Sequence, residues 1–453
     1  MTLTRTLAEF ITATRFDDLP TEAVVMTRRS ILDWLGSALR GGTTEPARIA
    51  HKVASRAMPG KDSTVLATGE TLSALGAAFV NGTASHIIEL DDLHQASTFH
   101  PAAPIIPAAL AVAERSNARG RDLIRAVALG YDVGIRVAEA VNPSHYRYWH
   151  PTATCGVFGA AAAASALLDL SPEQVVHALG TAGTQAGGLW EFLADGAMSK
   201  HLHAGMAAHD GILSADLAAA GFTGASRILE GPRGFFAATA DPAHPERVTA
   251  GLGRDFKIVE NGFKLHACCG HTHTAVDAAL LLRERIAGRP IERVDIDTYR
   301  VALDITDNPA PRTPYEAKFS IQYAVAVALL DGRAGLEQFT EERLAGDDIG
   351  ALLSRTSASE NPERTARYPA VWASHVRVTL SDGTVLEETV EHPKGMPANP
   401  LTDDEVAAKF HDLADPVVGH HTAARLVEEV NRLPDDPPVV DLILPLVQRL
   451  PVI

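Results

Sequence analysis

Stretches dominated by alanine and glycine at helical spacing are the feature that most limits how this chain can fold. Gly159–Ala164 and Ala215–Ala220 carry little side-chain bulk, and helices with small side chains can approach one another closely. The sequence therefore predicts a compact helical core. Helices are expected near Leu7–Ile11 and Thr21–Leu39 and at Thr71–Asn81, Pro104–Ser116, Gly120–Val141, Thr154–Leu168, Pro172–Gly180, Ser199–Ala220 and Pro245–Gly251.

The pattern changes after about Lys264. Helices are expected at Thr274–Ile286 and Phe319–Leu330, and Val294–Tyr299 alternates with the period of a strand. The clearest local signal is a hairpin, with strands at 375–380 and 385–390 joined through Asp382-Gly383. Glycine accepts the positive φ that such a turn requires.

This change in pattern predicts a mainly α protein with two domains. Residues 1–261 form the first part of a large helical domain, and residues 262–397 form a smaller α+β lid domain. Residues 398–453, with expected helices at Thr402–Leu413 and His420–Leu433, return to the helical domain.

Composition excludes several classes of protein. The 453 residues include 40 Lys+Arg and 56 Asp+Glu, which gives a net charge of −16 and argues against a nucleic-acid binder. Three cysteines cannot build a disulfide framework and indicate a reducing compartment. No signal peptide is evident, and the uncharged stretch Pro151–Leu168 is too weakly apolar for a membrane span. We expect a cytoplasmic protein with no membrane partner.

Familiar catalytic motifs are missing from the sequence. It contains no GxSxG, GxxxxGK[ST] or HExxH motif, and Gly251-Leu252-Gly253 lacks the third glycine of a dinucleotide fingerprint. Nucleotide cofactors and standard hydrolase machinery are therefore not expected. Four polar clusters within apolar or small-residue sequence remain as candidate sites.

The first cluster runs from Glu89 through Asp91 and Asp92 to His94 and His100. Adjacent carboxylates followed by histidines can order an imidazole, raise its pKa or hold a hydroxyl group. A helix cap and an acidic solvated loop are competing interpretations, and a metal site is a third, although no spacing here is diagnostic.

The second and third clusters precede Ala-rich helices. Tyr146 to Thr152 places His150 at a helix start, where an anion is favoured, although a lone histidine is more often a hydrogen-bonded core residue. Asp195 to His203 contains Lys200, which opens a helix. Lys200 either snorkels to solvent or, if buried, pairs with a carboxylate, for which a substrate is the natural candidate.

The fourth cluster, Phe263 to His273, contains a CCxHxH pattern at the proposed domain boundary, where ligand clefts often form. A zinc site competes here with anion binding or acid–base chemistry by Lys264 and His273. Adjacent Cys268 and Cys269 point apart in an extended chain and lack the usual C-x₂₋₄-C spacing, so we assign no metal.

These four motifs, in this order and at this spacing, resemble the MmgE/PrpD family, which includes 2-methylcitrate dehydratase, cis-aconitate decarboxylase and iminodisuccinate epimerase. The resemblance implies a homodimer, a helical domain built from both chain ends, a lid domain between them, and chemistry without a cofactor on small di- or tricarboxylates. It also implies an active site, which would contain His100, His150, Lys200 and Lys264, with Asp91, Asp92 and His273 close by and Tyr146 as a further substrate-binding residue.

Three positions depart from the decarboxylase members. Glu89 stands where they have aspartate, Leu93 where they have threonine, and Cys269 where they have histidine. The departures count against a strict cis-aconitate decarboxylase. They leave dehydration, epimerisation and an unassigned substrate open.

Proton transfer next to a carboxylate is the chemistry that the resemblance implies. Lys200 and Lys264 would bind substrate carboxylates, His100 and His150 would exchange protons, and Asp91 and Asp92 would orient a histidine or a hydroxyl. A 2-methylcitrate dehydratase-like hydro-lyase is the expected activity, with an epimerase or a decarboxylase as alternatives. A non-catalytic scaffold that binds carboxylates is the opposing class, and in it the two lysines would lie on separate solvated faces.

Overall fold

The chain folds into two compact units. The structure is a computed structural model and describes residues 2–447 of the 453. Within the described residues, unit 1 comprises 2–87, 91–261 and 402–447, and unit 2 comprises Ile88–Leu90 and Gly262–Leu401. Ile88–Leu90, which lie inside the first segment predicted for the helical domain, thus belong to unit 2. Unit 2 ends at Leu401, whereas the predicted lid domain ends at residue 397.

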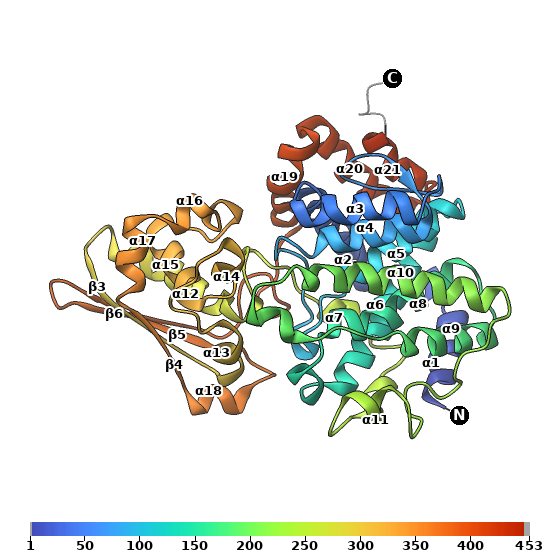
Figure 1. Ribbon diagram of the computed structural model, residues 1–453, viewed down its shortest axis with the longest axis horizontal. Coiled ribbons are helices and arrows are strands. Elements are labelled where there is room, and N and C mark those ends of the chain that lie inside the picture. Colours follow the sequence, from blue (N-terminus) through green and yellow to red (C-terminus); the bar gives the residue numbers. More distant parts are fainter. Residues whose placement is uncertain (1, 448–453) are drawn as a thin grey trace. The chain divides into compact units, whose positions relative to one another are not determined.

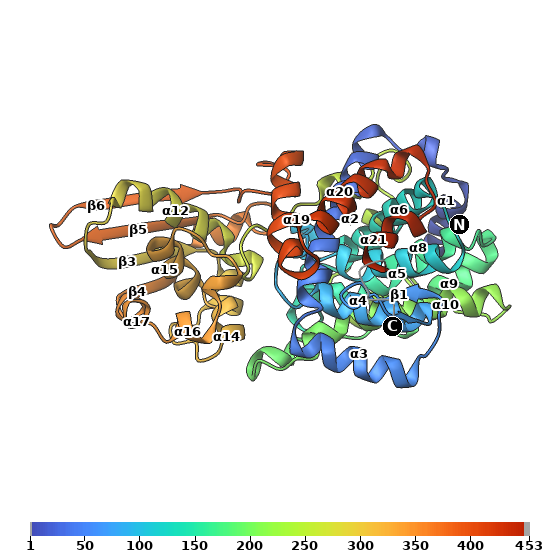
Figure 2. The ribbon, with the colours of Figure 1, turned by 90° about the horizontal axis from the view of Figure 1, so that it is seen from above.

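Unit 1 is built almost entirely from helices (Figures 1 and 2). Its helices are α1 (Leu3–Ala13), α2 (Thr21–Gly41), α3 (Glu45–Ala57), α4 (Ala74–Ser85), α5 (Ala102–Arg115), α6 (Gly120–Val141), α7 (Pro151–Thr154), α8 (Gly156–Leu167), α9 (Pro172–Thr184), α10 (Ser199–Ala219), α11 (Phe235–Thr239), α19 (Asp403–Val418), α20 (His420–Arg432) and α21 (Val440–Val447). A two-stranded ladder pairs β1 (Ser63–Thr64) with β2 (Thr71–Leu72).

Small residues let the central helices of unit 1 pack closely, as the composition predicts. A Cβ atom added to Gly159 on α8 would lie 2.7 Å from the carbonyl oxygen of Gly130 on α6 and 2.6 Å from Ile105 Cδ1 on α5. Contacts this short are not tolerated, so glycine is required where these helices cross. Helix α10 packs against both α4 and α8 in the same core.

An N-terminal helix and a C-terminal helix pack together within unit 1. Helix α19 lies along α2 (Figure 2), and Lys409 on α19 forms an ion pair of 2.5 Å with Asp33 on α2, with both side chains buried. A buried ion pair that joins two distant segments favours this one arrangement of them, because either charge alone would be costly to bury.

Unit 2 combines a four-stranded mixed sheet with helices. The strand order is β4-β3-β5-β6, with β3 at Ile291–Thr298, β4 at Thr356–Glu360, β5 at Ser374–Leu380 and β6 at Val385–Val390. Its helices are α12 (His273–Ile286), α13 (Arg300–Thr306), α14 (Pro314–Lys318), α15 (Ile321–Asp331), α16 (Glu341–Leu344), α17 (Asp347–Leu353) and α18 (Pro362–Arg367). Helix α12 packs on β5 and β6 (Figure 2).

The predicted fold class is confirmed: the protein is mainly α, with a helical unit built from both chain ends and a smaller α+β unit. The hairpin is confirmed around Gly383 (φ 84°), with its first strand beginning one residue earlier than predicted, at Ser374. Two predicted helices are corrected. Thr71–Leu72 is a strand, and α4 begins only after Ser73, whose hydroxyl caps it. Pro245–Val248 is a single 3-10 turn.

Over the part of the chain that the structure describes, none of the helices combines the length and the apolar character that a bilayer crossing requires.

Candidate active site

A buried acidic turn follows helix α4. His86 caps the helix, and Glu89 has a left-handed backbone conformation (φ 61°). The chain leaves unit 1 after Ile87 and returns to it at Asp91, so Glu89 belongs to unit 2 whereas Asp91 and Asp92 belong to unit 1. Consecutive carboxylates of one turn are thereby assigned to different units.

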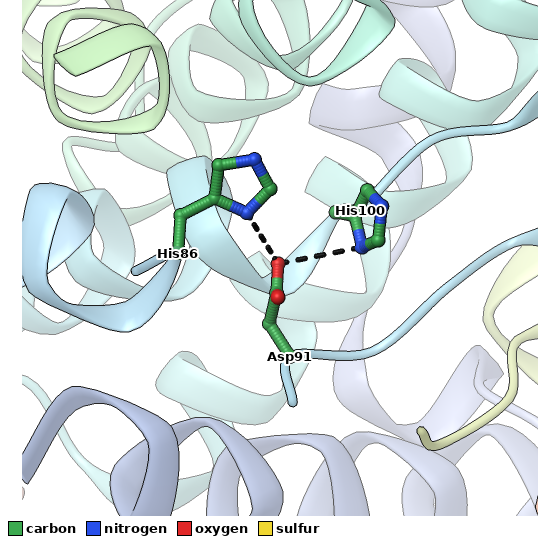
Figure 3. A group of neighbouring side chains, drawn as sticks. All are labelled: His86, Asp91 and His100. Carbon is green, nitrogen blue, oxygen red and sulfur yellow. Dashed lines mark hydrogen bonds and ion pairs between the residues drawn. The ribbon is translucent and has the colours of Figure 1, made fainter. Parts of the chain in front are cut away.

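Asp91 lies between two imidazoles (Figure 3). Its Oδ2 is 2.6 Å from His86 Nδ1 and 3.4 Å from His100 Nδ1. Because a carboxylate accepts hydrogen bonds, His86 carries its proton on Nδ1. His100 Nδ1 is also 2.6 Å from the carbonyl oxygen of Asp92 and therefore donates as well. In the neutral form of either ring, Nε2 is then the unprotonated nitrogen.

The same three residues present ligand atoms within 4.8 Å of one another, which raises the question of a metal ion. A metal binds the unprotonated nitrogen of an imidazole, but both Nδ1 atoms in this group already donate protons to oxygen. The donor set of His86, Asp91 and His100 therefore fits a hydrogen-bond network better than a metal centre.

The carboxyl group of Asp92 forms hydrogen bonds with three residues near the histidines. Oδ1 accepts a hydrogen bond from the backbone N–H of Ala102 at the start of α5, and Oδ2 accepts from Tyr131 (2.7 Å) and Asn261 (2.6 Å). Burial raises the pKa of Asp92 to about 8. The contact with Ala102 holds the start of α5, and the carbonyl of Asp92, rather than its carboxyl group, orients His100.

His150 immediately precedes α7 and is 1% exposed. Its ring stacks on that of His86, with centroids 5.3 Å apart, and His86 is in turn 5.2 Å from His100. His150 Nδ1 lies 3.0 Å from Nδ1 of His203 on α10. His86 is therefore at the centre of a cluster in which His100 and His150 are its flanking rings.

Lys200 is 2% exposed at the start of α10, three residues before His203. Burial, together with the neighbouring histidines and Lys200, holds the pKa of His150 well below its usual value. Burial, His86 and Lys200 lower the pKa of His203 to about 4. Both rings are therefore neutral near pH 7, and a neutral imidazole can accept a proton.

Tyr146 packs against Trp190, an aromatic residue that also contacts His150. Its ring meets that of Trp190 edge to face at 4.9 Å, and Trp190 meets His150 at the same distance. Tyr146 is thus joined to His150 through Trp190, a residue of the 3-10 turn Trp190–Ala194.

Unit 2 holds its own buried pair. Lys264 Nζ is 3.1 Å from Glu89 Oε2, and the two side chains are at most 2% exposed. Lys318 Nζ donates to the carbonyl oxygen of Ile88 and holds the same short segment. The ammonium group of Lys264 therefore already has a carboxylate partner in Glu89.

The CCxHxH segment does not gather its sulfur and nitrogen atoms. Cys268 Sγ contacts Thr272 Oγ1 at 3.0 Å, and His271 Nδ1 contacts Tyr299 Oη at 2.6 Å. His273 is 1% exposed, and burial holds its pKa well below the usual value. Within residues 2–447, no group of three potential ligand atoms draws on this segment.

The structure therefore brings together His100, His150 and Asp91 within unit 1, in electrostatic contact with Lys200. Lys264 and His273 lie in unit 2. Sequence reasoning assigned no role to His86 or His203. The position of His203, three residues after Lys200, places both on one helix face and offered a signal, whereas nothing distinguishes His86 from any polar residue that ends a helix.

Two family models and several known enzymes match this chain. The models of the MmgE/PrpD N-terminal and MmgE/PrpD C-terminal domains match residues 5–248 and 266–435. The chain is 29% identical to the cis-aconitate decarboxylase of Homo sapiens over 96% of this chain and 92% of that enzyme. It is 27% identical to the cis-aconitate decarboxylase-like protein oryM of Aspergillus oryzae over 97% and 96%.

A more local likeness links the chain to a second kind of enzyme. The 2-methylcitrate dehydratase of Cupriavidus necator is 41% identical to it over 28% of each chain. Both domain models of one family match in order and together cover most of the sequence. The chain belongs to the MmgE/PrpD family.

Proposed function

We propose that this protein is a lyase that works without a cofactor and moves a proton at a carbon next to a carboxylate of a small tricarboxylate. The observation that carries the proposal is the buried histidine cluster, in which His100 and His150 flank one ring beside Asp91 and in the field of Lys200. A carbon next to a carboxylate is a weak acid, so its deprotonation needs both a base and a nearby cation.

The environments of the two flanking histidines separate their roles. His150 is neutral, because burial and Lys200 disfavour its charged form, and it suits the base. His100 has the Asp91 carboxylate 3.4 Å from Nδ1, and an adjacent carboxylate favours the protonated imidazole. His100 therefore suits the acid, and Lys200 suits the group that stabilises the negative charge of the intermediate.

Dehydration follows directly from these roles. His150 takes the proton from the carbon, the electrons of the broken C–H bond form the carbon–carbon double bond, and the hydroxyl group leaves with a proton from His100 as water. This sequence supports a hydro-lyase similar to 2-methylcitrate dehydratase as the first candidate. Lys264, His273 and Tyr146 are proposed as further contacts for substrate carboxylates.

Decarboxylation is the second candidate, because the relatives that match over nearly the whole chain are named cis-aconitate decarboxylases. In that reaction a carbon–carbon bond breaks, carbon dioxide leaves, and a histidine delivers a proton to the carbon that keeps the electron pair. Glu89, Leu93 and Cys269 stand at positions where the resemblance implies other residues in decarboxylase members, which counts against a strict cis-aconitate decarboxylase.

Incubation of the protein with 2-methylcitrate, citrate and cis-aconitate in deuterated water tests the proposal. Loss of water supports the hydro-lyase, and release of carbon dioxide with deuterium in the product supports the decarboxylase. Deuterium uptake with neither loss indicates an epimerase instead. Tight binding of these acids without any conversion would contradict the lyase and support a binding scaffold.

Two variants test the assigned residues. His150→Gln and Lys200→Ala are expected to abolish turnover and to retain the circular dichroism spectrum of the wild type. Lys61→Ala, the same change at an exposed lysine of unit 1, serves as the matched control and should keep full activity. Folded His150→Gln or Lys200→Ala protein with near-normal turnover would refute the assignment.

We also propose a cytoplasmic homodimer, as the family resemblance implies. Sedimentation velocity at several concentrations measures the state directly. A single species at the mass of one 48.1 kDa chain would contradict the dimer.

A further inference from the structure

The contact between His150 and His203 joins a buried ring to a partly exposed one. We infer that His203 is a proton relay for His150 and carries the substrate-derived proton between that ring and solvent. The inference rests on the proposed function, because it assumes that His150 accepts this proton. His203 acts through His150 and is therefore a positioning residue for the reaction.

The first support is geometric. The two Nδ1 atoms are 3.0 Å apart, which is a hydrogen-bond distance between nitrogen atoms. A hydrogen bond needs one donor and one acceptor, so the pair of Nδ1 atoms holds one proton in total. Either His150 or His203 carries it, and a shift of that proton across the contact converts one arrangement into the other.

The second support is the difference in burial. His150 is 1% exposed, whereas His203 is only partly buried. Phe192 meets both rings edge to face, at 6.3 Å for His150 and 5.8 Å for His203. The contact is therefore enclosed by an aromatic ring, while the His203 end of the pair reaches the surface.

The third support comes from the backbone beside the pair. The N–H of His150 donates to the carbonyl oxygen of Gly188 across 3.0 Å. A Cβ atom at position 188 would lie 2.6 Å from Ala153 Cβ and 3.4 Å from His203 Nδ1, and φ is +143°. Glycine thus lets the main chain lie close to the His203 ring while its carbonyl oxygen holds the backbone N–H of His150.

The fourth support is electrostatic. Lys200 disfavours a positive charge on His150 and on His203 alike. A proton that His150 takes from a substrate is therefore not retained by either ring and has to leave. The structure offers an exit through the Nδ1 contact, because the acceptor at its far end is the more exposed histidine.

The transfer balances in three steps. At the start His150 holds its proton on Nδ1, donated to His203 Nδ1, and His203 holds its own proton on Nε2. When His150 Nε2 takes the substrate proton, the Nδ1 proton moves to His203. His203 then releases its Nε2 proton to water, so that both rings are again neutral with reversed tautomers. The same steps in reverse take up a proton from water at His203 Nε2, return the shared proton to His150 Nδ1 and release the Nε2 proton of His150 to the carbon or to water, which restores the start.

Substitutions of His203 distinguish a residue that passes a proton on from one that only holds His150 in place. In His203→Asn the side-chain amide occupies the place of Nδ1 and keeps the hydrogen bond but cannot pass a proton on. His203→Phe keeps the ring and loses the bond. Both are expected to lower kcat about 10²-fold with KM nearly unchanged. His209→Asn is the control, since His209 lies on the same helix and is bonded to Asp210.

Each outcome decides the matter. Wild-type kcat in His203→Asn with loss in His203→Phe would mean that the contact only orients His150, and wild-type kcat in both would remove any role. If the wild type converts none of the acids, ¹⁵N chemical shifts of the histidine rings still test the pair. One protonated Nδ1 shared between His150 and His203 supports the relay, and two unprotonated Nδ1 atoms overturn it whatever the activity.

Discussion

His86 donates its Nδ1 proton to the carboxylate of Asp91 across 2.6 Å, and neither side chain reaches solvent. Asp91 in turn lies 3.4 Å from His100 Nδ1, and the His86 ring stacks on His150. One buried hydrogen bond therefore holds the centre of the cluster from which the proposed acid and base are positioned. Its loss should affect stability as well as turnover.

Replacing His86 tests this bond. His86→Phe keeps a flat ring but removes the donor and leaves a buried carboxylate with one hydrogen bond fewer, which costs about 2–3 kcal/mol. His86→Asn places an amide N–H at the position of Nδ1 and should recover a large part of that loss. Urea unfolding of the two variants gives the difference, and equal free energies of unfolding would show that the bond contributes nothing.

The buried pair of Glu89 and Lys264 in unit 2 allows a double-mutant cycle. Removing one partner leaves an uncompensated charge with at most 2% exposure, so Lys264→Met should lower the free energy of unfolding by about 3–5 kcal/mol. Glu89→Gln should have a similar but smaller effect, since the amide oxygen still accepts a hydrogen bond. The double variant should be more stable than Lys264→Met alone. Simple addition of the two single effects would contradict the pairing.

Asp92 should make stability fall as the pH rises. Burial raises its pKa from 3.8 to about 8, so between these values the folded protein holds a proton that the unfolded chain has lost. The unfolded chain binds fewer protons in that interval, and the free energy of unfolding therefore decreases as the pH rises from about 4 to 8. Asp92→Asn cannot ionise and should lack this part of the dependence. Unfolding curves at pH 5 and pH 8.5 make the comparison, and identical pH slopes for both proteins would contradict the raised pKa.

Much of the fold could be predicted because its signals are local. Helix α6 has the predicted bounds, Gly120–Val141, and the Asp-Gly turn defines the hairpin of β5 and β6. Strand β4 was missed, because Thr356–Glu360 has no apolar alternation and is held by parallel pairing to β3, about sixty residues earlier in the chain. Pairing of that kind is set by tertiary contacts and leaves little trace in the segment itself.

The candidate site was predictable to the extent that its residues stand in motifs. The structure places Asp91, His100 and His150 around His86, but the different contacts of Asp91 and Asp92 depend on which carboxylate faces Tyr131 and Asn261. Those two partners lie 39 and 169 residues away. His86 lies within the cluster only because α4 ends where it does, and such a position is fixed by packing rather than by any local pattern.

Lys200 is close enough to His203 for removal of its charge to change the pKa of that histidine. Lys200→Met keeps a long unbranched side chain and removes a cation that disfavours protonation of His203, whose pKa is lowered to about 4. The pKa of His203 should therefore rise toward 6.5 but stop short of it, since burial and His86 also hold it down. NMR titration of the His203 ring follows this shift, with Lys61→Met as a surface control. Turnover should be lost in the same variant. An unchanged pKa of His203 together with lost activity would mean that Lys200 acts on the substrate alone. A raised pKa of His203 with full activity would remove Lys200 from the proposed chemistry.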